Sequence, residues 1–393
     1  MKTKICKVTP KDIFGIFKFL LILIPALLYK VYLILTKKEL WLICEMSEMA
    51  RDNGYAFYKY MKKNHPEIYT YYAIDKKYND YQKVKNLGNI IEWSSLKHYF
   101  YYISATLNIS SHKEGNPNHT LFTILHVYLN LFNNRVFLQH GVLYQNFYMF
   151  HRQNTKFKIF ITGTKPEYEF VKDKYEYKND EVKYTGLARF DYLWNAVPNK
   201  DMILYMPTWR RTLTNDKDLK DSLYYKRIMT FINNKELDTM LEKNNKYLYF
   251  CPHGGLRAVK DAFKTQNKRV IIIDIEKADI QTLLKEASLL ITDFSSLQTD
   301  FAFMNKPLLY YQYDEKFYQE KHIGEGAYDT YFDFKKDGFG EVIEEENDLI
   351  NAIDKNIKNN FILEEEYKER IDNCFMLHDN HNCERIYQLL SKN

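Results

Sequence analysis

The stretch Leu40-Trp41-Leu42-Ile43-Cys44 opens the part of the chain whose pattern decides the fold. An unbroken apolar segment of this length, followed by a polar segment and a longer helical stretch, is typical of a strand buried on both faces of a parallel sheet. The same alternation of short apolar or β-branched segments with longer helical stretches continues along the chain. This rhythm predicts an α/β fold with open parallel sheets covered by helices.

The rhythm predicts a series of strands before a Pro- and Asn-containing segment at Val197 to Lys200, and a second series after it. The expected strands are Leu40 to Cys44, Ile68 to Ile74, Asn89 to Trp93, Leu107 to Ser110, Arg135 to Gln139, Ile159 to Thr162, Val182 to Thr185, Met202 to Tyr205, Tyr247 to Cys251, Val270 to Asp274, Leu289 to Thr292 and Pro307 to Tyr311. Helical stretches are expected at Leu223 to Glu242 and Ile280 to Glu286, and the acidic tail from Glu341 onward is expected to be helical. We therefore expect an N-terminal segment over residues 1–37 and two α/β domains over residues 38–197 and 198–393.

Length and composition agree with this division. The chain has 393 residues, and domains of roughly 100–200 residues are usual, so two domains are expected. The 56 Lys and Arg against 51 Asp and Glu leave a net charge of only +5, which excludes a nucleic-acid binder defined by its charge. The 5 cysteines are sparse and odd in number, which favours a reducing cytoplasm over a disulfide scaffold.

Cys374, His378, His381 and Cys383 bring four potential zinc ligands close together in the sequence. They lack the usual paired spacing of zinc sites, so no metal site is predicted. We expect no tightly bound cofactor. A divalent cation is possible but is not indicated by the sequence.

The N-terminal segment Ile13 to Leu35 is mostly apolar, but Lys18, Lys30 and Pro25 interrupt it. As a helix, its uninterrupted part Phe19 to Tyr29 would rise about 16 Å, roughly half of a ~30 Å hydrocarbon core. The segment is also rich in lysines, at Lys2, Lys4, Lys7, Lys11, Lys18, Lys30, Lys37 and Lys38. Apolar burial and attraction to anionic lipid then act together, so the segment is predicted to lie on a membrane surface. No small-residue cleavage site indicates a signal peptide, and a helix packed on the domain stays an alternative.

Polar residues directly after predicted strands are the candidate site residues, because ligands of open α/β sheets bind outside the carboxyl ends of the strands. His140 and Gly141 follow one such strand, and a histidine there can act as a general base near neutral pH. A histidine bonded to loop backbone is the alternative. His253, followed by Gly254, repeats the arrangement in the second half and is assigned to the leaving group.

Three further groups follow predicted strands. Thr208, Arg210 and Arg211 combine a hydroxyl with two guanidiniums, which match phosphate oxygens, although a charged surface loop is the alternative. Asp293, Ser295 and Ser296 precede a helix start, where free N–H groups bind anions, although simple capping stays possible. Gly186 and Arg189 follow the last strand of the first half. No Walker loop, dinucleotide-binding glycine fingerprint, GxSxG elbow or HExxH motif is found.

Taken together, these segments resemble the CDP-glycerol glycerophosphotransferase family, the teichoic acid glycerol-phosphate primases and polymerases. The segments that carry the resemblance run in order over nearly the whole chain. They are the ARDNGY segment Ala50 to Tyr55, His140 with Gly141, Gly186 with Arg189 and Asp191, PTWR at Pro207 to Arg210, ITDFSS at Ile291 to Ser296, Lys306 with Pro307, and Cys383 to Ile386.

The resemblance implies a GT-B-like fold, with two Rossmann-like halves facing a central cleft and an N-terminal membrane-associating segment. It also implies a CDP-polyol donor bound by residues 198–393, a lipid-linked saccharide or polyol-phosphate acceptor bound by residues 38–197, and a peripheral location on the cytoplasmic face of the membrane. His140 is then the catalytic base and His253 the second histidine. Thr208, Arg210, Arg211, Asp293, Ser295, Ser296, Gly186 and Arg189 are expected at the donor, and Gly141, Arg51, Asp52 and Asn53 at the acceptor.

The sequence departs from the family pattern after His140, where Val142, Leu143 and Gln145 stand in place of Thr, Pro and Lys, and at Ala188, which replaces a proline. The sequence therefore does not decide the polyol: glycerol is the simplest expectation, and ribitol is the alternative. Two other functions are kept as alternatives: a GT-B glycosyltransferase that uses a nucleotide sugar, and a membrane-bound glycan-binding protein without activity.

Overall fold

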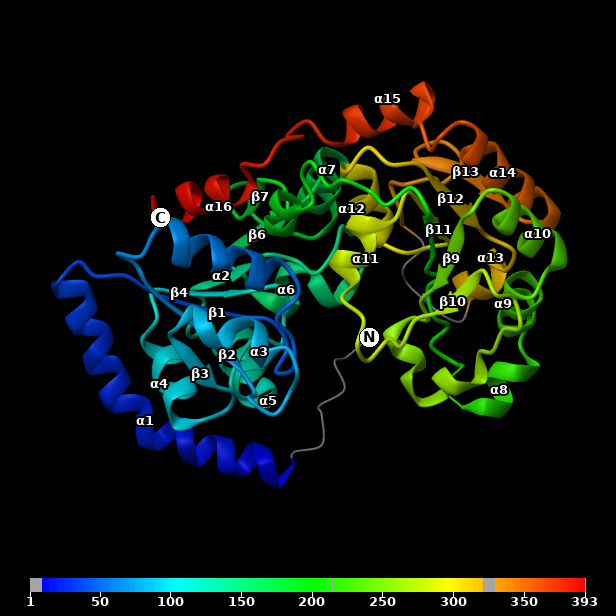
Figure 1. The fold of residues 1–393 in the computed structure, drawn as a ribbon. Helices are drawn as coiled ribbons and strands as arrows, with labels where there is room; N and C mark the ends of the chain where they lie inside the picture. Colours follow the sequence, from blue (N-terminus) through cyan, green and yellow to red (C-terminus); the bar gives the residue numbers. More distant parts are fainter. Residues whose placement is uncertain (1–8, 214, 321–328, 393) are drawn as a thin grey trace. The chain divides into compact units, whose positions relative to one another are not determined.

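The computed structural model describes residues 9–213, 215–320 and 329–392, which form two compact units, each built on one parallel sheet (Figure 1). Unit 1 comprises the chain up to Val142, Phe147–Tyr192 and the residues from Asp379 onward. Unit 2 comprises Leu143–Asn146 and Leu193–His378. The sheets confirm the α/β class predicted from the alternation of strands and helices.

Unit 1 contains a 7-stranded sheet in the order β3-β2-β1-β4-β5-β6-β7, in which every strand pair is parallel. Its strands are β1 (Leu40–Cys44), β2 (Tyr69–Ile74), β3 (Ile90–Glu92), β4 (Leu107–Ser110), β5 (Arg135–Phe137), β6 (Ile159–Thr162) and β7 (Val182–Tyr184). Its helices are α1 (Pro10–Leu35), α2 (Asn53–Asn64), α3 (Tyr81–Val84), α4 (Leu96–Ser104), α5 (His119–Thr123), α6 (Arg152–Thr155), α7 (Lys165–Lys174) and α16 (Asn382–Leu390).

The central strand β1 shows why this sheet is covered on both faces. Successive side chains of a strand point to opposite faces, and all five side chains of β1 are buried. Trp41 and Ile43 pack in one core with residues of α2 and α16. Leu40 and Leu42 pack in a second core with residues of α1, α4 and α5. A continuous apolar strand is therefore required at this position.

Unit 2 contains a 6-stranded parallel sheet in the order β10-β9-β8-β11-β12-β13. Its strands are β8 (Met202–Tyr205), β9 (Tyr247–Phe250), β10 (Val270–Ile272), β11 (Leu289–Thr292), β12 (Leu308–Tyr311) and β13 (Gly340–Ile343). Its helices are α8 (Asp216–Asp221), α9 (Leu223–Ile232), α10 (Lys235–Lys243), α11 (Ile280–Glu286), α12 (Leu297–Phe303), α13 (Glu315–Tyr318), α14 (Glu346–Lys358) and α15 (Glu365–Cys374). One face of this sheet packs on α9, α10 and α14.

Helix α1 lies along α4 on the surface of unit 1 and bends near its middle (Figure 1). Its buried residues are Gly15, Phe19, Ala26 and Leu33, which form one stripe along almost the whole helix. Pro25 lies inside the helix and has no N–H to donate, a usual cause of a bend. The helix is therefore held on unit 1 over its length. Lys2, Lys4 and Lys7, part of the expected basic segment, lie outside the described residues.

Every strand expected from the sequence overlaps an observed one, but three details differ. The strand β13 falls in the tail that was expected to be helical, since its four residues include only two with strong strand propensity. The expected helix Leu223 to Glu242 is two helices, because Asn234 caps a new helix through its side chain. The residues from Asp379 onward, expected in the second domain, belong to unit 1 because α16 packs on α2.

Candidate active site

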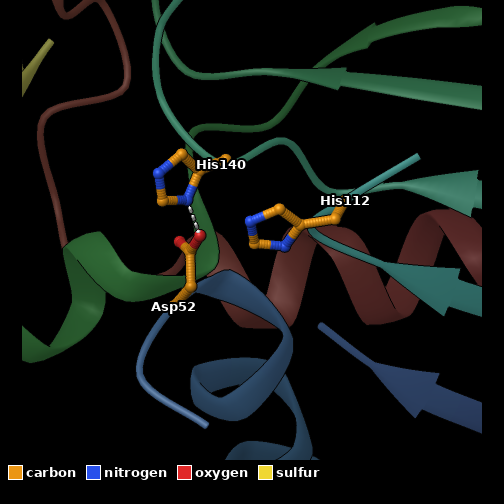
Figure 2. A group of neighbouring side chains, drawn as sticks. All are labelled: Asp52, His112 and His140. Carbon is orange, nitrogen blue, oxygen red and sulfur yellow. Dashed lines mark hydrogen bonds and ion pairs between the residues drawn. The ribbon is translucent and has the colours of Figure 1, made fainter. Parts of the chain in front are cut away.

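Asp52 and His140 form the centre of the candidate site in unit 1 (Figure 2). Asp52 is the N-cap of α2, where its carboxylate accepts from the Asn53 N–H, and it is 4% exposed. His140 lies in the loop after β5, and its Nδ1 is hydrogen-bonded to Asp52 Oδ2. The His140 side chain is 64% exposed. One ring nitrogen is therefore held by a buried carboxylate, while the imidazole as a whole stays accessible.

Gln139 sets the direction of His140. It has φ +65°, a left-handed conformation that costs a non-glycine residue on the order of 1 kcal/mol or more. The Asn53 Nδ2 donates to the Gln139 carbonyl at 2.8 Å, and Gln139 Nε2 donates to the Ile161 carbonyl at 2.6 Å. These bonds hold the strained turn that presents His140 beyond the end of the sheet.

Arg189 connects Asp52 with the loop that carries His140. Its guanidinium donates to Asp52 Oδ1 at 2.6 Å and to the His140 carbonyl at 2.5 Å. Its backbone N–H donates to Asn53 Oδ1 at 3.0 Å. The structure thus places Arg189, expected at the donor, within unit 1 beside Asp52, His140 and Asn53. Gly141 is buried directly after His140.

The charges around the pair shift both pKa values. Burial opposes ionisation of Asp52, but the His140 imidazole and the Arg189 guanidinium lower the pKa of Asp52 well below its usual range. The Asp52 carboxylate in turn raises the pKa of His140 above its usual value, against the effect of burial. Asp52 is therefore ionised at neutral pH, and it stabilises an imidazolium at His140.

Glu45 binds backbone N–H groups at the start of α2. It is fully buried and accepts from the backbone N–H groups of Arg51, Asp52 and Tyr55 at 2.9, 3.0 and 2.7 Å. Burial and the nearby Asp52 charge raise the pKa of Glu45 to about 7. Arg51, expected at the acceptor, pairs with the Asp80 carboxylate at 2.6 Å. Glu45 and Arg51 therefore both hold the loop that carries Asp52.

His112 is the part of this site that the sequence analysis missed. It lies in the loop after β4, and its ring points toward Asp52 and His140 (Figure 2). Its position directly after a predicted strand was the available signal. One ligand atom from each of the three residues lies within 4.8 Å of the others, as in some metal sites. The Arg189 guanidinium on Asp52 would repel a cation there, so the group fits a metal ion poorly.

The cysteine and histidine cluster near the C-terminus has other contacts. His378 Nε2 bonds to the Phe303 carbonyl at 2.7 Å, and the Cys383 thiol lies 3.3 Å from the Ala188 carbonyl. The two residues belong to different units.

In unit 2, Arg210 makes ion pairs inside the fold. Its guanidinium is fully buried and donates to both oxygens of Asp314, at 2.9 and 2.7 Å, and to Asp293 at 2.9 Å. Asp293 also accepts from the Thr208 N–H at 2.8 Å. The pair Arg210 and Asp293 therefore fixes the loop after β8, and the phosphate contact expected for Arg210 stays a prediction.

The other candidate residues after β8, and His253 after β9, have different surroundings. The Thr208 hydroxyl is buried and has no hydrogen-bond partner among the described residues. Trp209 stacks on His253, with ring centroids 5.8 Å apart and planes 2° apart. His253 Nδ1 accepts from the Gly255 N–H at 3.0 Å, so the other ring nitrogen is the one directed elsewhere. Arg211 is exposed.

The serines after β11 are partly exposed at the start of α12. The Ser295 hydroxyl accepts from the Leu297 N–H at 3.2 Å, whereas Ser296 makes no side-chain capping bond. Because α12 has only 7 residues, we assign any ligand contact there to the serine hydroxyls and not to a helix dipole.

Gly186 has a packing role. It has φ +77°, and a Cβ at this position would lie 1.8 Å from Asn382 Oδ1 of α16. Asp191 in the same segment accepts from the backbone N–H groups of Asn382 and Cys383, each at 2.8 Å. The segment Gly186 to Asp191 therefore docks α16, and the donor contact expected for Gly186 stays a prediction.

Comparison with known proteins agrees with this fold. Solved structures of the wall teichoic acid polymerase TagF share it: one has a TM-score of 0.67 and 16% sequence identity and covers 94% of this chain and 97% of that chain. The fold is thus an α/β fold with two Rossmann-like parallel sheets. The sequence profile of the CDP-Glycerol:Poly(glycerophosphate) glycerophosphotransferase family matches residues 27–392. The chain belongs to this family.

Two curated relatives are longer than this chain. The minor teichoic acid biosynthesis protein GgaB of Bacillus subtilis (strain 168) is 30% identical over 392 residues, which cover 94% of this chain and 41% of GgaB. The teichoic acid poly(glycerol phosphate) polymerase of the same strain is 24% identical over 334 residues, 77% of this chain and 41% of the polymerase. The chain thus spans about two fifths of the length of these relatives.

Proposed function

We propose that this protein transfers a polyol phosphate, most simply glycerol phosphate, from a CDP-polyol donor to a hydroxyl of a lipid-linked acceptor, with release of CMP. The observation that carries the proposal is the buried Asp52 carboxylate bound to Nδ1 of the exposed His140, in a chain of this family. A histidine held in this way is oriented for proton transfer through its Nε2.

In the proposed reaction, His140 Nε2 removes the proton of the acceptor hydroxyl. The acceptor oxygen then bonds to the phosphorus that carries the polyol, and the bond from this phosphorus to the oxygen bridging to CMP breaks. CMP leaves with that oxygen, and the proton stays on His140 until solvent takes it. Asp52 stabilises the imidazolium that forms, and Arg189 keeps the Asp52 carboxylate in place.

We assign the donor to unit 2. The Thr208 hydroxyl, the Ser295 and Ser296 hydroxyls, Arg211 and the His253 imidazole are the groups proposed to bind the donor phosphates. They follow β8, β9 and β11, at the carboxyl edge where α/β sheets bind ligands. Phosphoryl transfer depends mostly on positioning and charge stabilisation, which such groups supply.

We place the protein at the cytoplasmic face of the membrane, where its acceptor is anchored. Helix α1 is long and apolar enough to cross a membrane by length and composition. One stripe of it packs on unit 1, whereas Leu20, Ile24 and Leu28 on another side are 62%, 69% and 67% exposed. A helix held along a folded unit is better suited to lie in the lipid interface than to span the bilayer.

The test is CMP release by purified protein with detergent and a lipid-linked acceptor, offered CDP-glycerol, CDP-ribitol and UDP-sugars in parallel. We expect release from one CDP-polyol and its loss by about 10²- to 10⁴-fold in His140→Ala. The exposed His119, changed to Ala, is the matched control and should keep activity. Turnover of a UDP-sugar alone, or an active His140→Ala variant, would contradict the proposal.

A further inference from the structure

His112 lies against His140 but has no place in the reaction described so far. The two ring centroids are 4.8 Å apart and the ring planes are inclined by 36°. Figure 2 shows the His112 ring beside the His140 ring and next to the Asp52 carboxylate. The His140 ring is therefore bordered by His112 as well as by the carboxylate.

The loop that carries His112 is tied to the start of α2. The Ser111 hydroxyl accepts from the Gly54 N–H at 2.6 Å, two residues after Asp52. The His112 N–H donates to the Ser110 hydroxyl at 3.1 Å. A Cβ at Gly115 would lie 2.1 Å from the same hydroxyl, so this turn closes tightly. These contacts hold His112 at a constant place relative to Asp52.

No hydrogen bond explains why a histidine stands at this position. His112 Nδ1 is buried and has no hydrogen-bond partner among the described residues. Burial, and then the charge of His140, lower the pKa of His112 to about 4. The ring is therefore neutral at neutral pH. A buried polar atom without a partner is unfavourable, which indicates that packing against His140 keeps the ring here.

The other charged groups around the two rings come from four segments. They are Asp52 at the start of α2, Arg189 after β7, Glu45 after β1 and Glu114 in the His112 loop. Of these, Asp52 raises the pKa of His140 most. A ring that turned away from Asp52 would lose this effect.

We propose that His112 is a positioning residue, whose neutral ring packs against His140 and keeps its Nδ1 directed at Asp52 and its Nε2 directed outward. The inference rests on the proposed role of His140 as the base, but the ring contact itself can be tested without activity.

The experiment records the titration of the His140 imidazole by NMR of protein with ¹³C-labelled histidine, with His140→Gln to assign the signal. His112→Ala is expected to lower the His140 pKa, because the freed ring spends less time on Asp52. His112→Phe keeps a ring of similar shape and is expected to preserve the wild-type value. His119→Ala is the control for loss of a nearby histidine. Where His112→Ala does not fold, His112→Asn serves as the ringless variant.

Activity provides the second readout. In His112→Ala, kcat/KM is expected to fall about 10- to 100-fold, with little change in KM for the donor, and its acidic limb should move to lower pH. An unchanged His140 titration in the ringless variant would overturn the proposal. So would a His112→Phe variant as impaired as the ringless one, since the nitrogens would then matter more than packing. A wild-type enzyme that releases no product from any donor would refute the proposed function. The His140 titration would then still test the positioning role of His112.

Discussion

At the scale of single residues, the site depends on an asymmetry of burial between Asp52 and His140. Asp52 is almost completely buried, so its charge is little screened by water, whereas the exposed His140 can meet a substrate. Arg189 supplies the second charge that keeps Asp52 ionised inside the fold. A buried carboxylate without these partners would be strongly destabilising.

Asp52→Asn tests this arrangement. The amide cannot stabilise an imidazolium, so we expect kcat/KM to fall by about 10²- to 10⁴-fold. Because Asp52 raises the pKa of His140, its loss lowers this pKa, and the acidic limb of the pH profile should move to lower pH. The measurement is kcat/KM from CMP release across pH. A limb that stays in place or moves to higher pH would show that Asp52 does not control the base.

Glu45 predicts a pH dependence of stability. Its pKa in the folded protein, about 7, lies above the usual 4.5, so the folded state binds the proton more tightly than the unfolded state. Its contribution is complete below about pH 4.5 and is lost as pH rises through about 7. Relative to Glu45→Gln, the wild-type free energy of unfolding should fall by about 3 kcal/mol across this window. Urea unfolding at several pH values measures it, with Glu48→Gln as control; parallel curves for wild type and Glu45→Gln would refute it.

At the scale of elements, α16 closes unit 1 although it lies at the other end of the sequence from β1. Asp191 accepts from the first N–H groups of α16, which have no partner within the helix. Cys383 and Ile386 then pack in the core beside Trp41. This docking places the Asn382 side chain directly against the Gly186 backbone.

Gly186→Ala should therefore destabilise the protein by about 3 kcal/mol, through both backbone strain and collision with Asn382. Gly88 is a matched control: it also has φ +77°, but nothing lies within 4 Å of its added Cβ. Gly88→Ala should cost only the strain, about 1 kcal/mol. Free energies of unfolding from urea titration separate the two contributions. Equal losses in both variants would show that Asn382 gives way.

At the scale of the whole molecule, α1 gives unit 1 a large apolar surface. Its exposed side chains include Ile13, Phe17, Ile24, Leu28 and Leu35, all at least 60% exposed. Soluble surfaces rarely carry so many neighbouring apolar side chains, so this side of α1 is suited to the lipid interface.

Changing Leu20, Ile24 and Leu28 together to Ser should reduce binding to vesicles of anionic phospholipid by at least about 100-fold, because each side chain loses about 1.5–3 kcal/mol of burial in lipid. Stability should change little, since these side chains are exposed. Leu223, Ile362 and Met376 of unit 2, 52%, 60% and 66% exposed, changed together to Ser, are the control. Cosedimentation measures binding. A triple α1 variant that still sediments like the wild type would exclude this surface.

Particular residues show how far sequence reasoning reaches. His140 was predicted because it follows an apolar strand. The adjacent residue, Gln139, sets the direction of His140 through its left-handed backbone conformation. The contacts that hold Arg210 and Gly186 could not be predicted, because their partners, Asp314 and Asn382, are 104 and 196 residues away along the chain. Glu45 was not predicted as a site residue, because its three N–H donors come together only when α2 is folded.

The alternation of apolar strands and helices is a local property of the chain, because each strand buried on two faces needs an unbroken apolar segment. The α/β class, the two sheets and the candidate residues at strand ends follow from it directly. The contact of His112 with His140, the bracing of Asp52 by Arg189 and the docking of α16 on unit 1 depend on which distant segments meet. Tertiary packing alone decides these contacts, because hydrogen bonds and buried charges are satisfied by whatever partners the fold brings together.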